Sequence, residues 1–187
     1  MGLKFVDISQ VQTRMFRLAA FIAALMLPLA FGQIGVKAAP NINAESAEAW
    51  NGAEINWRDI RSGIREASQT KKTVIMVFHA PWCQACKKYR SVFRDRRIVE
   101  ASKDFIMILI DGDADKYTNG AFAPDGTYVP RTIFLNSEGD VLSKYTSKDP
   151  KFPHSLDVNS PEELLSLMRK AAAGNAPAQP APGERGT

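Results

Sequence analysis

The chain has 187 residues, enough for one domain of ordinary size with additional terminal segments. Its formal net charge of +4 is a mild basic excess, and Lys and Arg are spread along the chain rather than gathered in one run. Nucleic-acid-binding proteins concentrate basic residues on one face, so this distribution argues against nucleic acid as a partner. The 45% of hydrophobic residues is typical of a soluble globular protein.

The first 38 residues have the features of a secretory signal peptide. An uncharged apolar run from Leu18 to Phe31 follows two arginines, and small residues come after it. The run is shorter than the roughly 20 apolar residues of a membrane-spanning helix. We therefore predict a signal peptide over residues 1–38 that is cut after Ala38, with Met15 as an alternative start. An uncleaved signal segment would be the protein's contact with a membrane.

The predicted signal peptide implies export, and the compartment that the protein reaches determines whether its cysteines can stay oxidised. We expect the protein in the bacterial periplasm or secreted, with the lumen of the endoplasmic reticulum as the alternative. Each of these compartments is oxidising, so disulfides persist there.

Patterns along the rest of the chain predict one domain over residues 55–173. The polar residues 39–54 are expected to form a linker, and the Pro/Ala/Gly-rich residues 174–187 a disordered tail. Hydrophobic periodicity predicts a helix from Ile55 to about Thr70, a buried strand over 74–78, a helix from the cysteines to Phe93 and a second buried strand over 105–110. A polar loop over 112–128 and a hairpin of strands 132–135 and 141–145 are expected to follow. The last predicted helix is opened by Ser160, Pro161 and a capping-box Glu163.

This order of elements predicts an α/β fold. A strand–helix–strand unit requires a parallel crossover, whereas a hairpin adds antiparallel strands at the edge. The expected architecture is a mixed central sheet with helices on both faces.

The sequence Cys83-Gln84-Ala85-Cys86 holds both cysteines of the chain, at the junction of a strand pattern and a helix pattern. A disulfide that closes so short a loop removes little entropy from the unfolded chain, so the pair is better explained by chemistry than by stabilisation. At a helix start, unpaired N–H groups favour the Cys83 thiolate, and Lys87 and Lys88 add positive charge. We predict that Cys83 attacks a substrate disulfide and that Cys86, further along the helix and more buried, resolves the mixed disulfide without a cofactor.

Three other interpretations of the pair remain open. A zinc site would need two more ligands, and the chain offers only His79 and His154. A copper-handling site fits an exported protein, and an inert structural disulfide is the third alternative. A protein of a different class, a chaperone-like binding module whose thiols tether a client, also fits these residues. We expect His79 to be a satisfied structural histidine, and Asp111, Asp113 and Asp115 to be solvated loop carboxylates rather than calcium ligands.

The residues from Phe78 to Lys87, the order of elements and the Val129-Pro130 step resemble the thioredoxin superfamily. The loop Phe122–Arg131, with its sequence Pro-Asp-Gly-Thr-Tyr-Val-Pro-Arg, is similar to a narrower group, the small single-domain thioredoxin-like proteins of the endoplasmic reticulum related to the anterior-gradient proteins, and their bacterial relatives. The resemblance implies a three-layer thioredoxin-like fold and thiol–disulfide exchange with cysteine-containing client proteins and a redox partner not yet identified.

The resemblance also implies roles for three residues besides the cysteines. Trp82 would flank the catalytic cleft. A cis peptide bond between Val129 and Pro130 would face the cysteine pair, and the Val129 backbone would pair with an extended substrate. The sequence departs from the family at Val77, where many thioredoxins carry a buried carboxylate that moves protons, and at Gln84-Ala85, which contains no histidine.

Overall fold

The computed structural model describes residues 44–175, so most of the predicted N-terminal segments and the tail after residue 175 lie outside the described residues. These include the signal peptide, its cleavage site and Met15. Within residues 44–175, no helix is both long enough and apolar enough to cross a bilayer.

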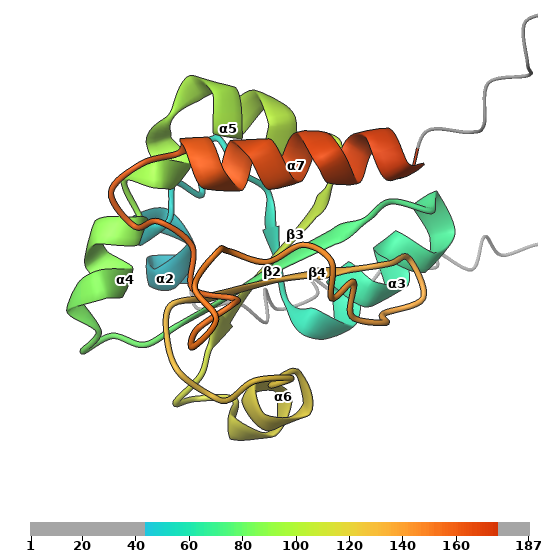
Figure 1. Ribbon diagram of the computed structural model, residues 1–187. Coiled ribbons are helices and arrows are strands. Elements are labelled where there is room, and N and C mark those ends of the chain that lie inside the picture. The colour runs from blue at the N-terminus through green and yellow to red at the C-terminus, as the bar shows by residue number, and fades with distance from the viewer. Residues whose placement is uncertain (1–43, 176–187) are drawn as a thin grey trace, which may run out of the picture. The chain divides into compact units, whose positions relative to one another are not determined.

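A mixed four-stranded sheet forms the centre of the fold (Figure 1), in the spatial order β1-β3-β2-β4. Its strands are β1 (Trp57–Arg58), β2 (Val74–His79), β3 (Ile106–Asp111) and β4 (Arg131–Leu135). β1 and β2 run parallel to β3, whereas β4 runs antiparallel to β2. The parallel unit arises because the chain crosses over through helices between β2 and β3.

The central strands are buried on both faces, as their continuous apolar runs predict. Successive side chains point to opposite faces, so Ile75 and Val77 belong to one core and Val74, Met76 and Phe78 to the other. Helices cover both faces (Figure 1), with α3 (Ile60–Thr70) on one side and α5 (Arg96–Ser102) and α7 (Glu162–Asn175) on the other. The predicted fold class, an α/β fold with a mixed central sheet and helices on both faces, is confirmed.

Residues 44–54, the described part of the predicted linker 39–54, are folded onto the domain. Residues Ala44–Ala49 form helix α2, and the Trp50 side chain that follows is fully buried. The Trp50 ring makes edge contacts with Trp57, Tyr89 and Phe93 at centroid distances of 5.3 to 6.4 Å. The Trp50 side chain thus joins the described part of this segment to the core. The polar average composition of the segment does not indicate this contact.

Two predicted helices begin or end at other residues. The helix expected from Ile55 begins at Ile60, because the Asp59 carboxylate caps it by accepting hydrogen bonds from the N–H groups of Arg61 and Ser62. The helix after the cysteines divides into α4 (Gln84–Tyr89), a 3₁₀ turn (Val92–Arg94) and α5, which is capped by Asp95.

Three predictions for the second half need correction. The loop after β3 contains helix α6 (Lys116–Ala121), whose N-cap is Asp115. The hairpin is reduced to one bridge between Leu135 and Val141, because a turn from Leu142 to Tyr145 leads the chain off the sheet and Tyr145 enters the core. The capping box is not closed: Glu163 accepts from the Asp157 N–H, while Ser160 accepts from Glu162.

Candidate functional site

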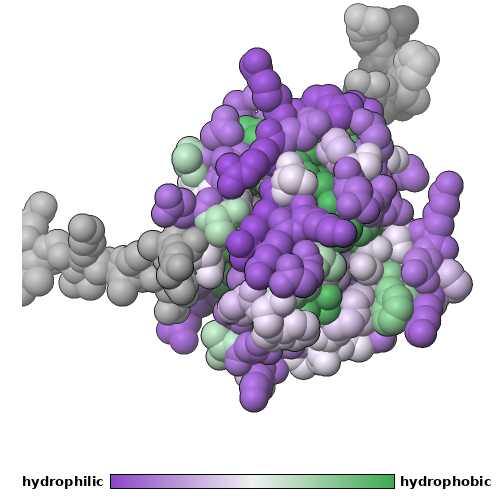
Figure 2. Space-filling view, turned by 90° about the vertical axis from the view of Figure 1, so that its left-hand side faces the viewer, coloured by the Kyte–Doolittle hydropathy of each residue, from purple (hydrophilic) through white to green (hydrophobic). Residues whose placement is uncertain are grey.

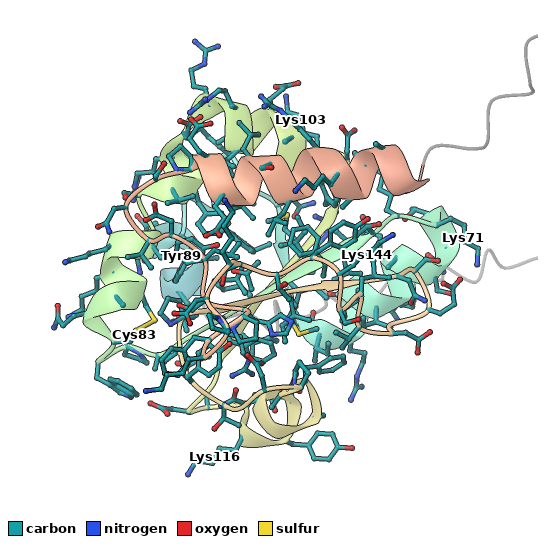
Figure 3. The ribbon with its side chains drawn as sticks, in the orientation of Figure 1. Lys71, Cys83, Tyr89, Lys103, Lys116 and Lys144 are labelled. Carbon is teal, nitrogen blue, oxygen red and sulfur yellow. A yellow bond between two sulfur atoms is a disulfide. The ribbon has the colours of Figure 1, made fainter. Side chains whose placement is uncertain are left out.

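Cys83 and Cys86 form a disulfide where the chain enters helix α4 (Figure 3), with the two Sγ atoms 2.26 Å apart. Cys83 is the N-cap residue in an extended conformation, and its Sγ accepts a hydrogen bond from the Cys86 N–H at 3.0 Å. Cys86 is fully buried and Cys83 is 3% exposed. The N–H group that would otherwise be unpaired at this helix start therefore points at the predicted nucleophile, where it favours a thiolate.

The loop before β4 faces this sulfur. The Val129–Pro130 peptide bond is cis, as the family resemblance implies. The Val129 carbonyl oxygen lies 3.7 Å from Cys83 Sγ, although the two residues are 46 positions apart in the sequence. The fold thus brings together Cys83, Cys86, Val129 and Pro130.

Trp82 lies beside the pair on the surface, with 67% of the residue exposed. Its indole Nε1 donates a hydrogen bond to Asp113 Oδ2 at 2.6 Å. Asp113 follows β3 in a turn in which the Asp111 carboxylate accepts from the Asp113 and Ala114 N–H groups. Asp113 is thus a partner of Trp82 rather than a purely solvated carboxylate, which the sequence pattern did not indicate.

The surroundings of the pair are basic and, on the visible face, mainly hydrophilic. Lys87 and Lys88 are exposed on α4. Figure 2 shows the face of the molecule that carries α4, where hydrophilic side chains surround smaller hydrophobic patches. Positive charge near the helix start lowers the free energy of a Cys83 thiolate.

Position 77, where many thioredoxins carry a buried carboxylate, is occupied here by Val77, which is fully buried in the apolar core. His79, two residues further along the same strand, is 1% exposed, and within residues 44–175 neither of its ring nitrogens has a hydrogen-bond partner. His79 is thus a buried residue of the core, as predicted, but the predicted hydrogen-bond partner of its ring is not found among the described residues. Burial lowers the pKa of His79 to about 4, although Asp111 raises it.

Tyr89 closes the far end of α4. Its hydroxyl pairs with Thr132 Oγ1 of β4 at 2.9 Å, and burial raises the pKa of the phenol. The side chain lies inside the fold (Figure 3), where it ties α4 to the strand that follows Pro130. The helix that carries both cysteines is therefore anchored to the sheet.

The described residues around the cysteine pair do not form a metal-binding cluster. Among the residues that the structure describes, no group of three or more His, Cys, Asp or Glu side chains is placed to hold a metal ion. His154 instead pairs through Nδ1 with Asp125 Oδ1 at 2.8 Å.

Comparison with known proteins agrees with this geometry. Residues 56–137 match a family model described as thioredoxin-like. Over 124 residues the chain is 30% identical to anterior gradient protein 1 of Xenopus tropicalis, a match that covers 64% of each protein and thus less than two thirds of that relative. Over 90 residues it is 30% identical to the thiol:disulfide interchange protein DsbD of Ralstonia nicotianae, covering 44% of this chain and 14% of that one.

A solved structure supports the fold. The solution structure of a thioredoxin from Thermus thermophilus superposes with a TM-score of 0.52 at 13% identity, and the match covers 66% of this chain and 91% of that one. Residues 56–137 therefore match the thioredoxin-like family, the Cys-x-x-Cys pair of Cys83 and Cys86 lies inside this matched segment, and the chain is similar to the anterior gradient proteins.

Proposed function

We propose that this protein is an exported thiol–disulfide oxidoreductase that exchanges disulfides with cysteine-containing proteins. The observation that carries the proposal is the position of Cys83 Sγ, which is bonded to Cys86 and lies 3.7 Å from the Val129 carbonyl oxygen. An extended client chain that pairs with the Val129 backbone would place its own sulfur near Cys83. The exposed indole of Trp82 supplies an apolar surface at the same place.

The exchange proceeds in two balanced steps. In the reducing direction, the Cys83 thiolate attacks one sulfur of a client disulfide, forms a mixed disulfide and releases a client thiolate. The Cys86 thiolate then attacks Cys83 Sγ, which releases the second client thiolate and leaves the Cys83–Cys86 disulfide. The pair gives up two electrons, which the client accepts, and the oxidising direction is the reverse sequence.

The chemistry requires a second partner rather than a cofactor. Both electrons reside on the two sulfurs, so the pair itself carries them between proteins. A redox partner in the same compartment must return the pair to its starting state after each exchange. Its identity would decide whether the protein works as an oxidase, a reductase or an isomerase.

Trapping of mixed disulfides tests the proposal and the separate roles of the cysteines. Cys86→Ala should accumulate a mixed disulfide at Cys83 with an oxidised peptide, as measured by mass spectrometry of the intact adduct. Cys83→Ala should accumulate far less, because Cys86 is fully buried and it is Cys83 Sγ that faces the Val129 carbonyl. Equal adducts in the two variants would refute the assignment of the nucleophile.

Turnover separates exchange from mere tethering of a client. The wild-type protein should reduce a peptide disulfide repeatedly when dithiothreitol restores the pair, and Cys83→Ser should not. A single stoichiometric adduct without turnover would favour the chaperone-like module. Stoichiometric copper or zinc after purification under reducing conditions would favour a metal carrier.

Export has its own test, which is independent of the chemistry. The mature N-terminus of the protein from its native host should begin at Ala39. A protein that retains Met1 and its apolar segment in the cytosol would refute the proposed location.

A further inference from the structure

The loop that faces Cys83 is held by a cluster of buried and half-buried polar side chains outside the cysteine pair. Residues 122–130 belong to no helix or strand, yet they carry the Val129 carbonyl oxygen to within 3.7 Å of Cys83 Sγ. A loop without a hydrogen-bonded ladder needs other contacts to hold one carbonyl at a fixed distance. Two sets of contacts, one on each side of the loop, meet this need.

The first set comes from Arg131, which is fully buried at the start of β4. Its Nη1 donates to the Tyr128 carbonyl at 2.9 Å, and its Nη2 donates to the Phe122 carbonyl at 3.2 Å. One guanidinium therefore holds both ends of the loop. It also donates to the Asn119 side chain at 2.8 Å and lies 4.2 Å from the centre of the Phe78 ring.

The second set is formed by Asp125, Tyr128 and His154. The Asp125 carboxylate accepts hydrogen bonds from the Tyr128 hydroxyl and, at 2.8 Å, from His154 Nδ1. The backbone N–H of His154 donates to the Tyr128 hydroxyl at 3.0 Å. Partial burial raises the pKa of Asp125, but these hydrogen bonds outweigh it, so the pKa lies below its ordinary value.

His154 also joins this cluster to the sheet. Its carbonyl oxygen accepts a hydrogen bond from the Thr132 N–H at 2.8 Å, while its side chain, 5% exposed, holds the loop. Thr132 is the residue whose hydroxyl pairs with Tyr89 of α4, the helix that carries the cysteines. A continuous set of contacts thus runs from the loop through His154 and β4 to that helix.

We propose that Asp125, Tyr128 and His154 form a clamp that positions the Val129 carbonyl for a peptide substrate, so that the clamp governs exchange with polypeptides but not with small thiols. The inference rests on the proposed function. These three are positioning residues, since they act through the Val129 backbone and their hydrogen bonds in the described part of the chain do not involve a cysteine sulfur. A small dithiol needs access to Cys83 alone, whereas a peptide also needs the backbone contact.

The test compares two reactions of the same variants. The first is kcat/KM for reduction of a synthetic peptide disulfide, and the second is the rate constant for reduction of the Cys83–Cys86 disulfide by dithiothreitol. Tyr128→Phe removes one hydroxyl that contacts both Asp125 and His154. We expect the peptide kcat/KM to fall about three- to tenfold, mainly through KM, because part of the free energy of the two lost hydrogen bonds serves to position the loop. The dithiothreitol rate should not change.

Two further variants sharpen the comparison. Tyr117→Phe removes a hydroxyl from a residue that is 87% exposed on α6, and it should behave as wild type in both reactions. His154→Leu should reproduce the effect of Tyr128→Phe, and His154→Asn, which keeps a donor near Nδ1, should recover part of the peptide rate. Circular dichroism at the assay temperature selects conditions in which all variants are folded.

Each result has a definite meaning. An unchanged peptide rate in Tyr128→Phe, or an equal fall in both reactions, overturns the clamp while the proposed function stands. A wild-type protein that reacts with dithiothreitol but not with peptides refutes the proposed exchange with polypeptides, and the clamp falls with it. A wild-type protein that reacts with neither refutes the proposed function, and the role of the clamp falls with it.

Discussion

The imidazole of His79 lies 5.4 Å from the indole of Trp50, measured between ring centroids, and both rings are closed off from solvent. Burial lowers the pKa of His79 to about 4, Asp111 raises it and Arg90 lowers it further. The ring is therefore neutral in the folded protein at pH values where it is protonated in the unfolded chain. Folding and protonation of this histidine are coupled.

Loss of stability in acid should follow from His79. As the pH falls from about 6.5 to about 4, the unfolded chain binds a proton that the folded protein does not, so the free energy of unfolding falls. The total effect is up to about 3 kcal/mol, at about 1.4 kcal/mol per pKa unit. Urea unfolding at several pH values measures it. In His79→Leu the slope between pH 4 and 6.5 should decrease, and a slope equal to that of wild type would refute the assignment.

Trp50 should make residues before position 55 necessary for stability. Trp50→Ala removes a fully buried ring that contacts three other aromatic side chains, and should cost about 3–5 kcal/mol. The matched control is Trp82→Ala at a residue that is 67% exposed, which should cost far less. A chain that begins at Ala44 should keep its stability, whereas one that begins at Ile55 should lose as much as Trp50→Ala. Equal melting temperatures for the two truncated chains would contradict this.

The order of most elements could be predicted because the buried strands leave a strong local signal. Residues 74–78 and 106–110 are continuous apolar runs, which are typical of strands buried on both faces. The predictions that differ from the structure concern segments whose local structure is determined by long-range contacts. Trp50 is recruited into the core by distant rings, and the strand expected after Asn136 is lost because Tyr145 packs against Phe134 instead.

The candidate site shows the same division. Cys83 and Cys86 are three positions apart and could be located from their spacing, whereas Val129 and Pro130 came from family resemblance alone. The roles of Asp113 and His154 could not be predicted from sequence patterns, because the hydrogen-bond partner of each lies 29 or more positions away in the sequence. Single carboxylates and histidines in loops carry no periodic signal that distinguishes a positioning role from a solvated one.

Packing of α3 against the sheet should not tolerate a methyl group at Gly63. A Cβ atom added there would lie 2.5 Å from the side chain of Ile108, which is fully buried in β3. Gly63→Ala should therefore overpack the interface and cost about 1–3 kcal/mol. Gly120→Ala in α6 is the control, since a Cβ there meets nothing within 4 Å and Ala favours a helix. Thermal unfolding should rank Gly63→Ala below wild type, and Gly120→Ala equal to it or above; the reverse order would refute the packing argument.

The residues between the cysteines should set a moderate reduction potential. Gln84 and Ala85 are exposed on α4 and carry no positive charge, so the Cys83 thiolate is stabilised by the helix start and nearby lysines alone. A more stable thiolate makes a disulfide more oxidising, and the strongly oxidising end of the family lies near about −120 mV. We expect a value well below that from equilibration with glutathione buffers, read by mass spectrometry after thiol alkylation. Ala85→His should shift the potential in the oxidising direction, because an imidazolium near Cys83 stabilises the thiolate, whereas Ala85→Gln should shift it little. A wild-type value near about −120 mV, or equal values in the two variants, would show that other groups control the thiolate.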